Sequence, residues 1–192
     1  MGIRIMLVDE SPDRAAVLEQ ALRQQGYDVV ASVATGPDLL RSVSRIRPDV
    51  IIIDMESPDR DTLEDMQVIH RDLPCPIVMF THDGDSAKIG EAIRAGVSAY
   101  IVDGLDPARI RPIIEVAIAR FSQFQALREE LYEAQTRLAE RKVIERAKGI
   151  LMQQRALSEN EAYQLMRRMA MERNMRIIEL ARSLITAAEL LG

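Results

Sequence analysis

The sequence has very few aromatic residues. Phe, Trp and Tyr make up 4% of its 192 residues, and tryptophan is absent. An RNA-binding module that stacks bases on an aromatic sheet is therefore disfavoured. Hydrophobic residues reach 47% and include ten methionines. This composition favours an aliphatic core built from helices and a buried sheet.

Thiols and long apolar runs are also scarce. Cys75 is the only cysteine, so an internal disulfide or a metal site built on several thiolates is excluded. The longest purely aliphatic run, residues 50–53, is too short to cross a bilayer. The first residues lack the apolar core and cleavage site of a signal peptide. We therefore expect a cytoplasmic protein without membrane contact.

Charge of the two signs is unevenly distributed. Residues 1–127 carry 13 Lys and Arg against 20 Asp and Glu, whereas residues 128–192 carry 12 against 10. The first part is acidic and the second weakly basic. The basic excess is too small to indicate nucleic-acid binding by itself.

The first part of the chain alternates between strand and helix patterns. Its Val- and Ile-rich runs span residues 3–8, 27–31, 50–53, 77–80 and 99–102. Segments with helical periodicity separate them, which predicts a doubly wound, five-stranded parallel sheet of the flavodoxin-like type. Ser11-Pro12 and Asp106-Pro107 are expected to cap helix starts, and Gly26 and Gly96 to follow helix ends.

Acidic and hydroxyl side chains follow several of these strands. Asp9-Glu10, Asp54, Thr81 and Asp103 stand at the carboxyl ends of predicted strands, where open α/β sheets place their sites. Clustered carboxylates need a cation, and their hard oxygen ligands suit Mg²⁺. We therefore expect Asp9, Glu10 and Asp54 to form a magnesium site.

These residues resemble the receiver domain of two-component response regulators. The resemblance makes Asp54 the phosphoacceptor, and it makes Thr81 and Tyr100 switch residues. Receivers normally carry Lys-Pro after the fifth strand, where this chain has Asp103-Gly104. A carboxylate there repels a phosphoryl group. We therefore expect Asp54 to be poorly phosphorylated, or not to be the physiological trigger.

The middle of the chain is predicted to form one long helix, from about residue 107 to 155, because residues 113–148 contain no Pro or Gly. Its first apolar stripe, expected to pack on the sheet, consists of Ile110, Ile114, Ala117, Phe121 and Phe124. A second stripe comprises Leu127, Leu131, Ala134 and Leu138. The second stripe predicts a parallel homodimeric coiled coil, with an intramolecular helical hairpin as the alternative.

Two shorter helices are expected after the long one. Ser158 and Glu161 form a capping box that starts the first of them, and Asn174 ends it. An amphipathic segment, residues 177–188, predicts the last helix. Gly149 within the long helix is expected to allow close helix approach.

This helical segment resembles the ANTAR domain, the RNA-binding output of AmiR/NasT-type antiterminators. The likeness is carried by Ala147, Lys148, Gly149, Leu151, Met152, Ala162, Tyr163, Leu165 and Ala170. Lys148, Tyr163 and Arg167 fall on the family pattern and are the first candidates for RNA contact. Further candidates, chosen by charge and proximity, are Arg146, Arg155, Arg168 and Arg176.

The resemblances together imply three parts: a receiver-like domain (1–120), a coiled-coil linker helix (121–141) and an all-α, three-helix ANTAR domain (142–192). The implied function is transcription antitermination through tandem stem-loops in a leader RNA, without catalysis. A NasS-like ligand-sensing protein or a sensor kinase would control it, and residues 77–81 and 96–104 look closest to the NasT branch of nitrate and nitrite assimilation. The main alternative is a DNA-binding response regulator, although Met175–Ile178 offers only Arg176 for reading bases. A phosphatase with Asp54 as nucleophile ranks third, since no suitable catalytic lysine follows.

Overall fold

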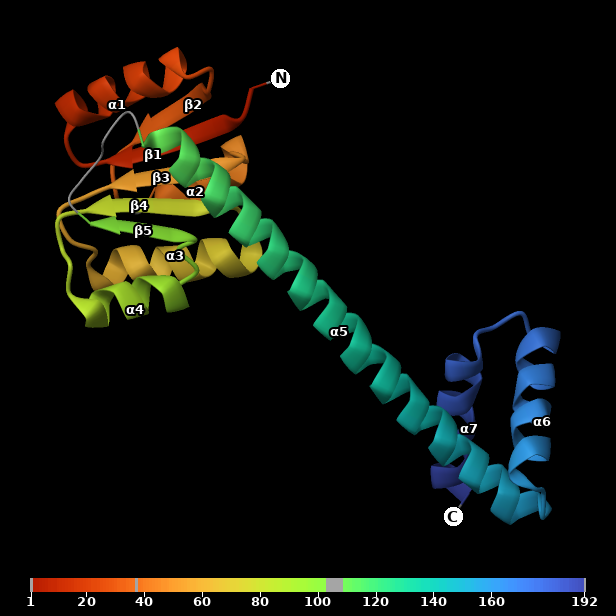
Figure 1. Cartoon of the computed structure of the whole chain (residues 1–192). Helices are drawn as coiled ribbons and strands as arrows, with labels where there is room; N and C mark the ends of the chain where they lie inside the picture. Colours follow the sequence, from red (N-terminus) through yellow and green to blue (C-terminus); the bar gives the residue numbers. More distant parts are fainter. Residues whose placement is uncertain (1, 37, 103–108, 192) are drawn as a thin grey trace. The chain divides into compact units, whose positions relative to one another are not determined.

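All five Val- and Ile-rich runs form strands of one parallel sheet (Figure 1). In a computed structural model, which describes residues 2–36, 38–102 and 109–191, the strand order is β2-β1-β3-β4-β5. The strands are β1 (Arg4–Asp9), β2 (Asp28–Val33), β3 (Val50–Asp54), β4 (Ile77–Thr81) and β5 (Ala99–Val102). The order reverses at β1, so β1 and β3 flank the topological switch point where such sheets bind ligands.

Helices cover both faces of the sheet. Helix α1 (Pro12–Gln24) and the start of α5 (Ile110–Arg155) pack on Ile5 and Leu7 of β1. The opposite face, marked by Met6 and Val8, packs against α2 (Leu39–Ile46), α3 (Arg60–Asp72) and α4 (Ser86–Arg94). Alternate residues of a strand point to opposite faces, so both faces of β1 are buried. This confirms the predicted doubly wound α/β fold.

The predicted helix punctuation is partly correct. Gly26 and Gly96 follow the ends of α1 and α4 with φ of 87° and 100°, a left-handed conformation that glycine adopts without strain. Ser11 precedes Pro12 as expected, but its side chain accepts no capping hydrogen bond. The Ser11 amide donates to Asp9 Oδ1 instead. The predicted Asp106-Pro107 cap lies outside the described residues.

The described chain divides into two compact units, Met1–Gln125 and Ala126–Gly192, and α5 runs through the boundary. Ile110, Ile114 and Ala117 of the first stripe are fully buried against the sheet. Phe124 is 47% exposed, although its ring lies 5.7 Å from that of His70. Within the described ranges, none of the helices is long and apolar enough to cross a membrane.

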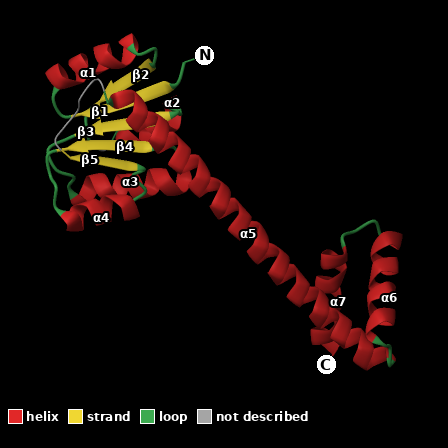
Figure 2. Ribbon diagram, viewed as in Figure 1, coloured by secondary structure: helices red, strands yellow, loops and turns green. Residues whose placement is uncertain are grey.

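The second unit packs the end of α5 against α6 (Glu159–Glu172) and α7 (Ile177–Leu191) (Figure 2). The fully buried centre of its core consists of Ala147, Ala162, Met166 and Ala181. Ser158 and Glu161 form the predicted capping box, and Asn174, with φ of 50°, follows the end of α6. The expectation for Gly149 is wrong, because a Cβ there would meet no atom of another described element within 4 Å.

Candidate functional site

Two carboxylates meet at the switch point of the sheet. Asp9 ends β1 and Asp54 ends β3, and the two are paired in the strand register. Adjacent strands lie about 4.8 Å apart, so the side chains share one small region. The Asp9 side chain is only 1% exposed and that of Asp54 13%. The prediction that the strand ends bring these acids together is confirmed.

A guanidinium group lies between the two carboxylates. Arg14, in the first turn of α1, places Nη2 3.2 Å from Asp9 Oδ1 and Nε 3.9 Å from Asp54 Oδ2. Asp9 Oδ1 also accepts a hydrogen bond of 2.7 Å from the Ser11 amide. Asp9 Oδ2, in contrast, is buried and has no hydrogen-bond partner in the part of the chain that the structure describes.

Burial and charge act in opposite directions on Asp54. Burial raises the pKa of Asp54 above its ordinary value, and the neighbouring Asp9 carboxylate raises it further. The Arg14 guanidinium and His82 lower the pKa in turn. The hydrogen bond to Asp9 also raises the pKa of Arg14, so the guanidinium stays fully charged at the site.

The acidic site partly fits a divalent cation. Asp9 and Asp54 are hard oxygen ligands of the kind Mg²⁺ prefers, and the unpartnered Asp9 Oδ2 is available for coordination. Glu10, the third predicted ligand, is exposed and accepts a hydrogen bond from Thr35 instead. Among residues 2–36, 38–102 and 109–191, no three carboxylate, imidazole or thiolate side chains are grouped to hold a metal ion.

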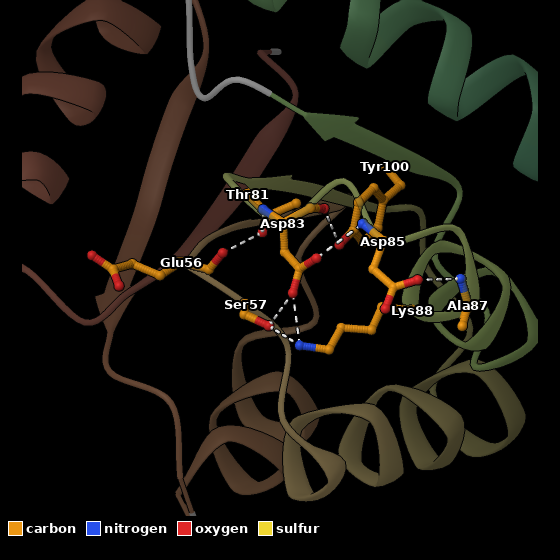
Figure 3. A network of polar contacts seen from close by, with 8 residues as sticks. All are labelled: Glu56, Ser57, Thr81, Asp83, Asp85, Ala87, Lys88 and Tyr100. Carbon is orange, nitrogen blue, oxygen red and sulfur yellow. Dashed lines mark hydrogen bonds and ion pairs between the residues drawn. The ribbon is translucent and has the colours of Figure 1, made fainter.

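The predicted switch residues belong to a polar network beside this site (Figure 3). The hydroxyl of Thr81, at the end of β4, donates to the Glu56 carbonyl at 2.7 Å and accepts from the Asp83 amide at 3.1 Å. The hydroxyl of Tyr100 on β5 donates to the Asp83 carbonyl at 2.9 Å. These hydrogen bonds tie the loop after β4 to β5, and the end of β4 to the loop after β3. Asp103 lies outside the described residues.

A lysine closes the same network. Lys88, in the first turn of α4, places its ammonium 2.7 Å from Asp83 Oδ2 and 2.6 Å from Ser57 Oγ, as Figure 3 shows. The Ser57 hydroxyl also donates to Asp83 Oδ2 at 2.7 Å. These hydrogen bonds, together with one from the Asp85 amide, lower the pKa of Asp83 to about 2. The loops after β3 and β4 are thereby joined.

The sequence interpretation missed Arg14 and Lys88. Each is five residues after the acid it pairs with, Asp9 and Asp83 respectively, and each lies in the first turn of the helix that follows a strand. In both cases the first turn of the helix brings its basic residue back to an acid that precedes the helix. This acid-to-base spacing was the available signal.

In the helical unit, Lys148 is buried rather than presented to solvent. Its side chain is 9% exposed, and its ammonium lies 2.6 Å from Glu145 and 2.8 Å from Glu159. Glu145 lies on the same helix, while Glu159 begins α6, so the pair joins two helices. Both carboxylates raise the pKa of Lys148. RNA contact by Lys148 stays a prediction, because these ion pairs compete with it.

The remaining cationic candidates fall into two groups. Arg146 pairs with Glu189 at 2.8 Å and Arg176 with Glu179 at 3.7 Å. The second group has exposed guanidinium groups without a carboxylate partner among the described residues, and it comprises Arg155, Arg167 and Arg168.

The outward face of α6 gathers two of these free arginines. Tyr163, which is 42% exposed, precedes Arg167 by one helical turn, and Arg168 lies beside it. Met171 on the same face is 71% exposed. Apart from Tyr163, which lies at the edge of the buried stripe, these side chains face away from the buried Ala162, Met166 and Ala170. We call the surface formed by Tyr163, Gln164, Arg167, Arg168 and Met171 the α6 outer face. All but Tyr163 line an open hollow of about 390 Å³, together with Glu172.

Comparison with protein families assigns both units. Residues 5–115 match the response regulator receiver domain, and residues 133–185 match the ANTAR domain. The transcriptional regulatory protein PdtaR of Mycobacterium tuberculosis is 30% identical over 170 residues, which cover 88% of this chain and 83% of PdtaR. The DNA-binding response regulator MtrA of Mycolicibacterium smegmatis is also 30% identical, but over 115 residues and 50% of its length.

Solved structures support the fold of the first unit. A LuxR-family two-component response regulator from Aurantimonas sp. SI85-9A1 has a TM-score of 0.54 at 32% identity, covering 62% of this chain and 86% of that one. The chemotaxis response regulator CheY4 of Vibrio cholerae has a TM-score of 0.54 at 22% identity, covering 61% and 99%. At 22% identity, the likeness to CheY4 supports the fold alone.

Proposed function

The chain belongs to the response regulators that join a receiver domain to an ANTAR domain, and on this basis we propose that it regulates transcription in the cytosol by binding RNA. Its helical unit would bind stem-loops of a leader RNA and stabilise a structure incompatible with a downstream terminator. RNA polymerase then reads through. The α6 outer face, with two exposed arginines that form no ion pair among the described residues, is the observation that carries this proposal.

The chemistry of the α6 outer face suits RNA. Guanidinium groups bind phosphates in a planar, forked geometry and also stack on bases. The exposed ring of Tyr163 adds a stacking surface one turn from Arg167. RNA loops present unpaired bases and phosphates together, so a face that combines a ring with two free cations fits a loop better than a regular duplex.

Competition binding with hairpin RNA and promoter DNA tests the proposal. The full chain should prefer tandem hairpins over the duplex, and the double substitution R167A/R168A should weaken hairpin binding at least tenfold. If each arginine contacts a phosphate, the slope of log affinity against log salt should fall by about 1.5. R60A is the matched control, because Arg60 is an exposed arginine of the other unit. Preference for the DNA duplex would support a DNA-binding regulator instead.

The ion pairs of Lys148 separate a structural role from RNA contact. Replacing Lys148 by alanine removes the buried ammonium and leaves the carboxylates of Glu145 and Glu159 without this partner, so K148A should lower the melting temperature of the helical unit together with RNA affinity. R167A should lower affinity alone. Circular dichroism melts beside the binding assay distinguish these cases. If K148A weakens binding with an unchanged melting curve, Lys148 contacts RNA directly.

We propose further that α5 forms a parallel homodimer. Leu127, Leu131 and Leu138 are 63%, 57% and 56% exposed, and Ala134 between them is exposed as well. Their 4-3-4 spacing is that of a coiled-coil seam. The alternative of a helical hairpin finds no support, because α6 and α7 pack on residues 143–152 of α5 and not on this stripe.

Sedimentation of the full chain and two variants tests the dimer. L131E should shift the chain towards the monomer, since it would place two carboxylates, one from each chain, opposite each other in the buried seam. E129A, on the same exposed part of α5, should leave the dimer intact. A monomeric unmodified chain at micromolar concentration would contradict the proposal.

For the input we propose control by a sensor kinase or by a ligand-sensing NasS-like protein, with poor phosphorylation of Asp54. The sequence likeness to the NasT branch favours nitrate or nitrite assimilation as the regulated process. A phosphate-sensitive gel after incubation with acetyl phosphate and Mg²⁺, with D54N as control, measures the modification. Stoichiometric, long-lived labelling of Asp54 would refute poor phosphorylation. Sequencing the transcripts that co-purify with the chain would identify the operon.

A further inference from the structure

We propose that Arg14 is a built-in counter-ion of the acidic site and competes with divalent cations for Asp9 and Asp54. The proposal rests on these two residues as the input site and not on RNA binding. The Arg14 guanidinium lies within 3.2 Å of one carboxylate and 3.9 Å of the other. It therefore lies between the two carboxylates that would hold a divalent cation.

The site favours a cation, because one carboxylate oxygen of Asp9 has no hydrogen-bond partner among the described residues. Asp9 is 6% exposed, and its Oδ2 has no hydrogen-bond partner among the described residues. A buried carboxylate oxygen without a donor is costly. The single guanidinium thus covers Oδ1 and approaches Asp54, while Oδ2 stays unsatisfied. A cation that binds Oδ2 must displace Arg14 or bind against its positive charge.

The Arg14 side chain is able to move away from the two carboxylates. Its side chain is 40% exposed, so the guanidinium can turn into solvent without leaving a cavity in the core. Lys88 is not a substitute, since its ammonium is bound to Asp83 and Ser57. Among the described cationic side chains, Arg14 is the one paired with both Asp9 and Asp54.

The consequence is weak affinity for magnesium. One positive charge about 4 Å from a carboxylate interacts strongly in a partly buried site, and Mg²⁺ must either displace it or bind against its repulsion. When bound, Mg²⁺ would neutralise the charge that accumulates on phosphorylation of Asp54. Because Arg14 already occupies the site, we expect Mg²⁺ to bind and neutralise this charge only at high metal concentration.

Calorimetric titration of the full chain with MgCl₂ alone tests the competition. R14Q should bind Mg²⁺ at least tenfold more tightly than the unmodified chain, and D9N/R14Q should lose this gain. R14K keeps the charge and should stay close to the unmodified chain. R23Q is the matched control, because Arg23 lies on the same helix and pairs with a partly exposed glutamate, Glu19.

The outcomes separate clearly. Equal Mg²⁺ affinity of R14Q and the unmodified chain, or tight binding by R14K, would overturn the proposal. A measurement without substitution guards against misfolding of R14Q: the Arg14 Nε–H resonance should shift as MgCl₂ is added, and a site that fills with Mg²⁺ while this signal stays fixed overturns the proposal as well. Hairpin binding by R14Q should be unchanged, so failure of the RNA proposal shows separately.

Discussion

Replacing Gly149 by alanine should stabilise the helical unit. Gly149 lies within α5, where glycine is about 1 kcal/mol less favourable than alanine. A Cβ at this position would meet no atom within 4 Å apart from the backbone of its own helix, so the substitution adds no clash. Because the backbone is already helical, the gain also includes the lower conformational entropy of the unfolded chain. We expect about 0.5–1 kcal/mol in the free energy of unfolding.

The assay is a thermal melt of the full chain, monitored by circular dichroism. About 1 kcal/mol corresponds to an increase of roughly 4–8 °C in the melting temperature of a small domain, which is easily measured. G90A on α4 serves as the matched comparison, because its Cβ would meet only the flexible end of Arg94 at 3.3 Å. Its gain should appear in the first unit. An unchanged or lower melting temperature for G149A would refute the reasoning.

Three further predictions concern the receiver unit. G96A should destabilise it by about 1–3 kcal/mol in a urea titration, because Gly96 has φ of 100° and a Cβ would overlap the His70 ring. K88A should raise the pKa of Asp83 from about 2 towards its ordinary value, as carboxyl carbon NMR can measure. The stabilising effect of this pairing should be complete above pH 4 and lost as the pH falls through about 2. Cys75, whose burial raises the pKa of its thiol to about 12, should react slowly with a disulfide reagent at pH 8 until urea unfolds the chain; rapid labelling of the native protein would contradict its burial.

The strands and helices could be predicted because their signals are local. Runs such as residues 50–53 and 77–80 are apolar on both faces, as central strands of a parallel sheet require. The observed strands extend one residue further, to Asp54 and Thr81, because polar residues can end a strand while they keep its hydrogen bonds. Apolar periodicity says nothing about such terminal residues.

Exposure of the long helix could be predicted only in part. Ile110, Ile114 and Ala117 share the period of the first stripe and are fully buried. Phe124 continues the same period but is half exposed, because the sheet that the stripe packs on does not extend that far. A sequence pattern shows which residues share a face of a helix, but not where the opposing surface ends.

The charge pairs of the site could not be predicted from residue types alone. Asp9, Asp54 and Thr81 were identified because strand ends of one sheet meet at one edge. Arg14 and Lys88 lie on helices, and which acid each of them reaches depends on the direction in which the first helical turn runs. Both helices start after a strand and a short loop. In both, the cation of the first helical turn pairs with an acid five residues earlier in the chain.

Lys148 shows why a residue on a family pattern need not touch the ligand. The capping box engages Glu161 with Ser158, which leaves Glu159 as the first-turn carboxylate free to pair elsewhere. Glu159 is favourable there because it faces the positive end of the α6 dipole, and its pairing with Lys148 fixes the start of α6 against α5. The position of the α6 outer face therefore depends on Lys148. Loss of RNA binding in a Lys148 variant consequently measures the placement of Tyr163 and Arg167 as much as any contact of its own.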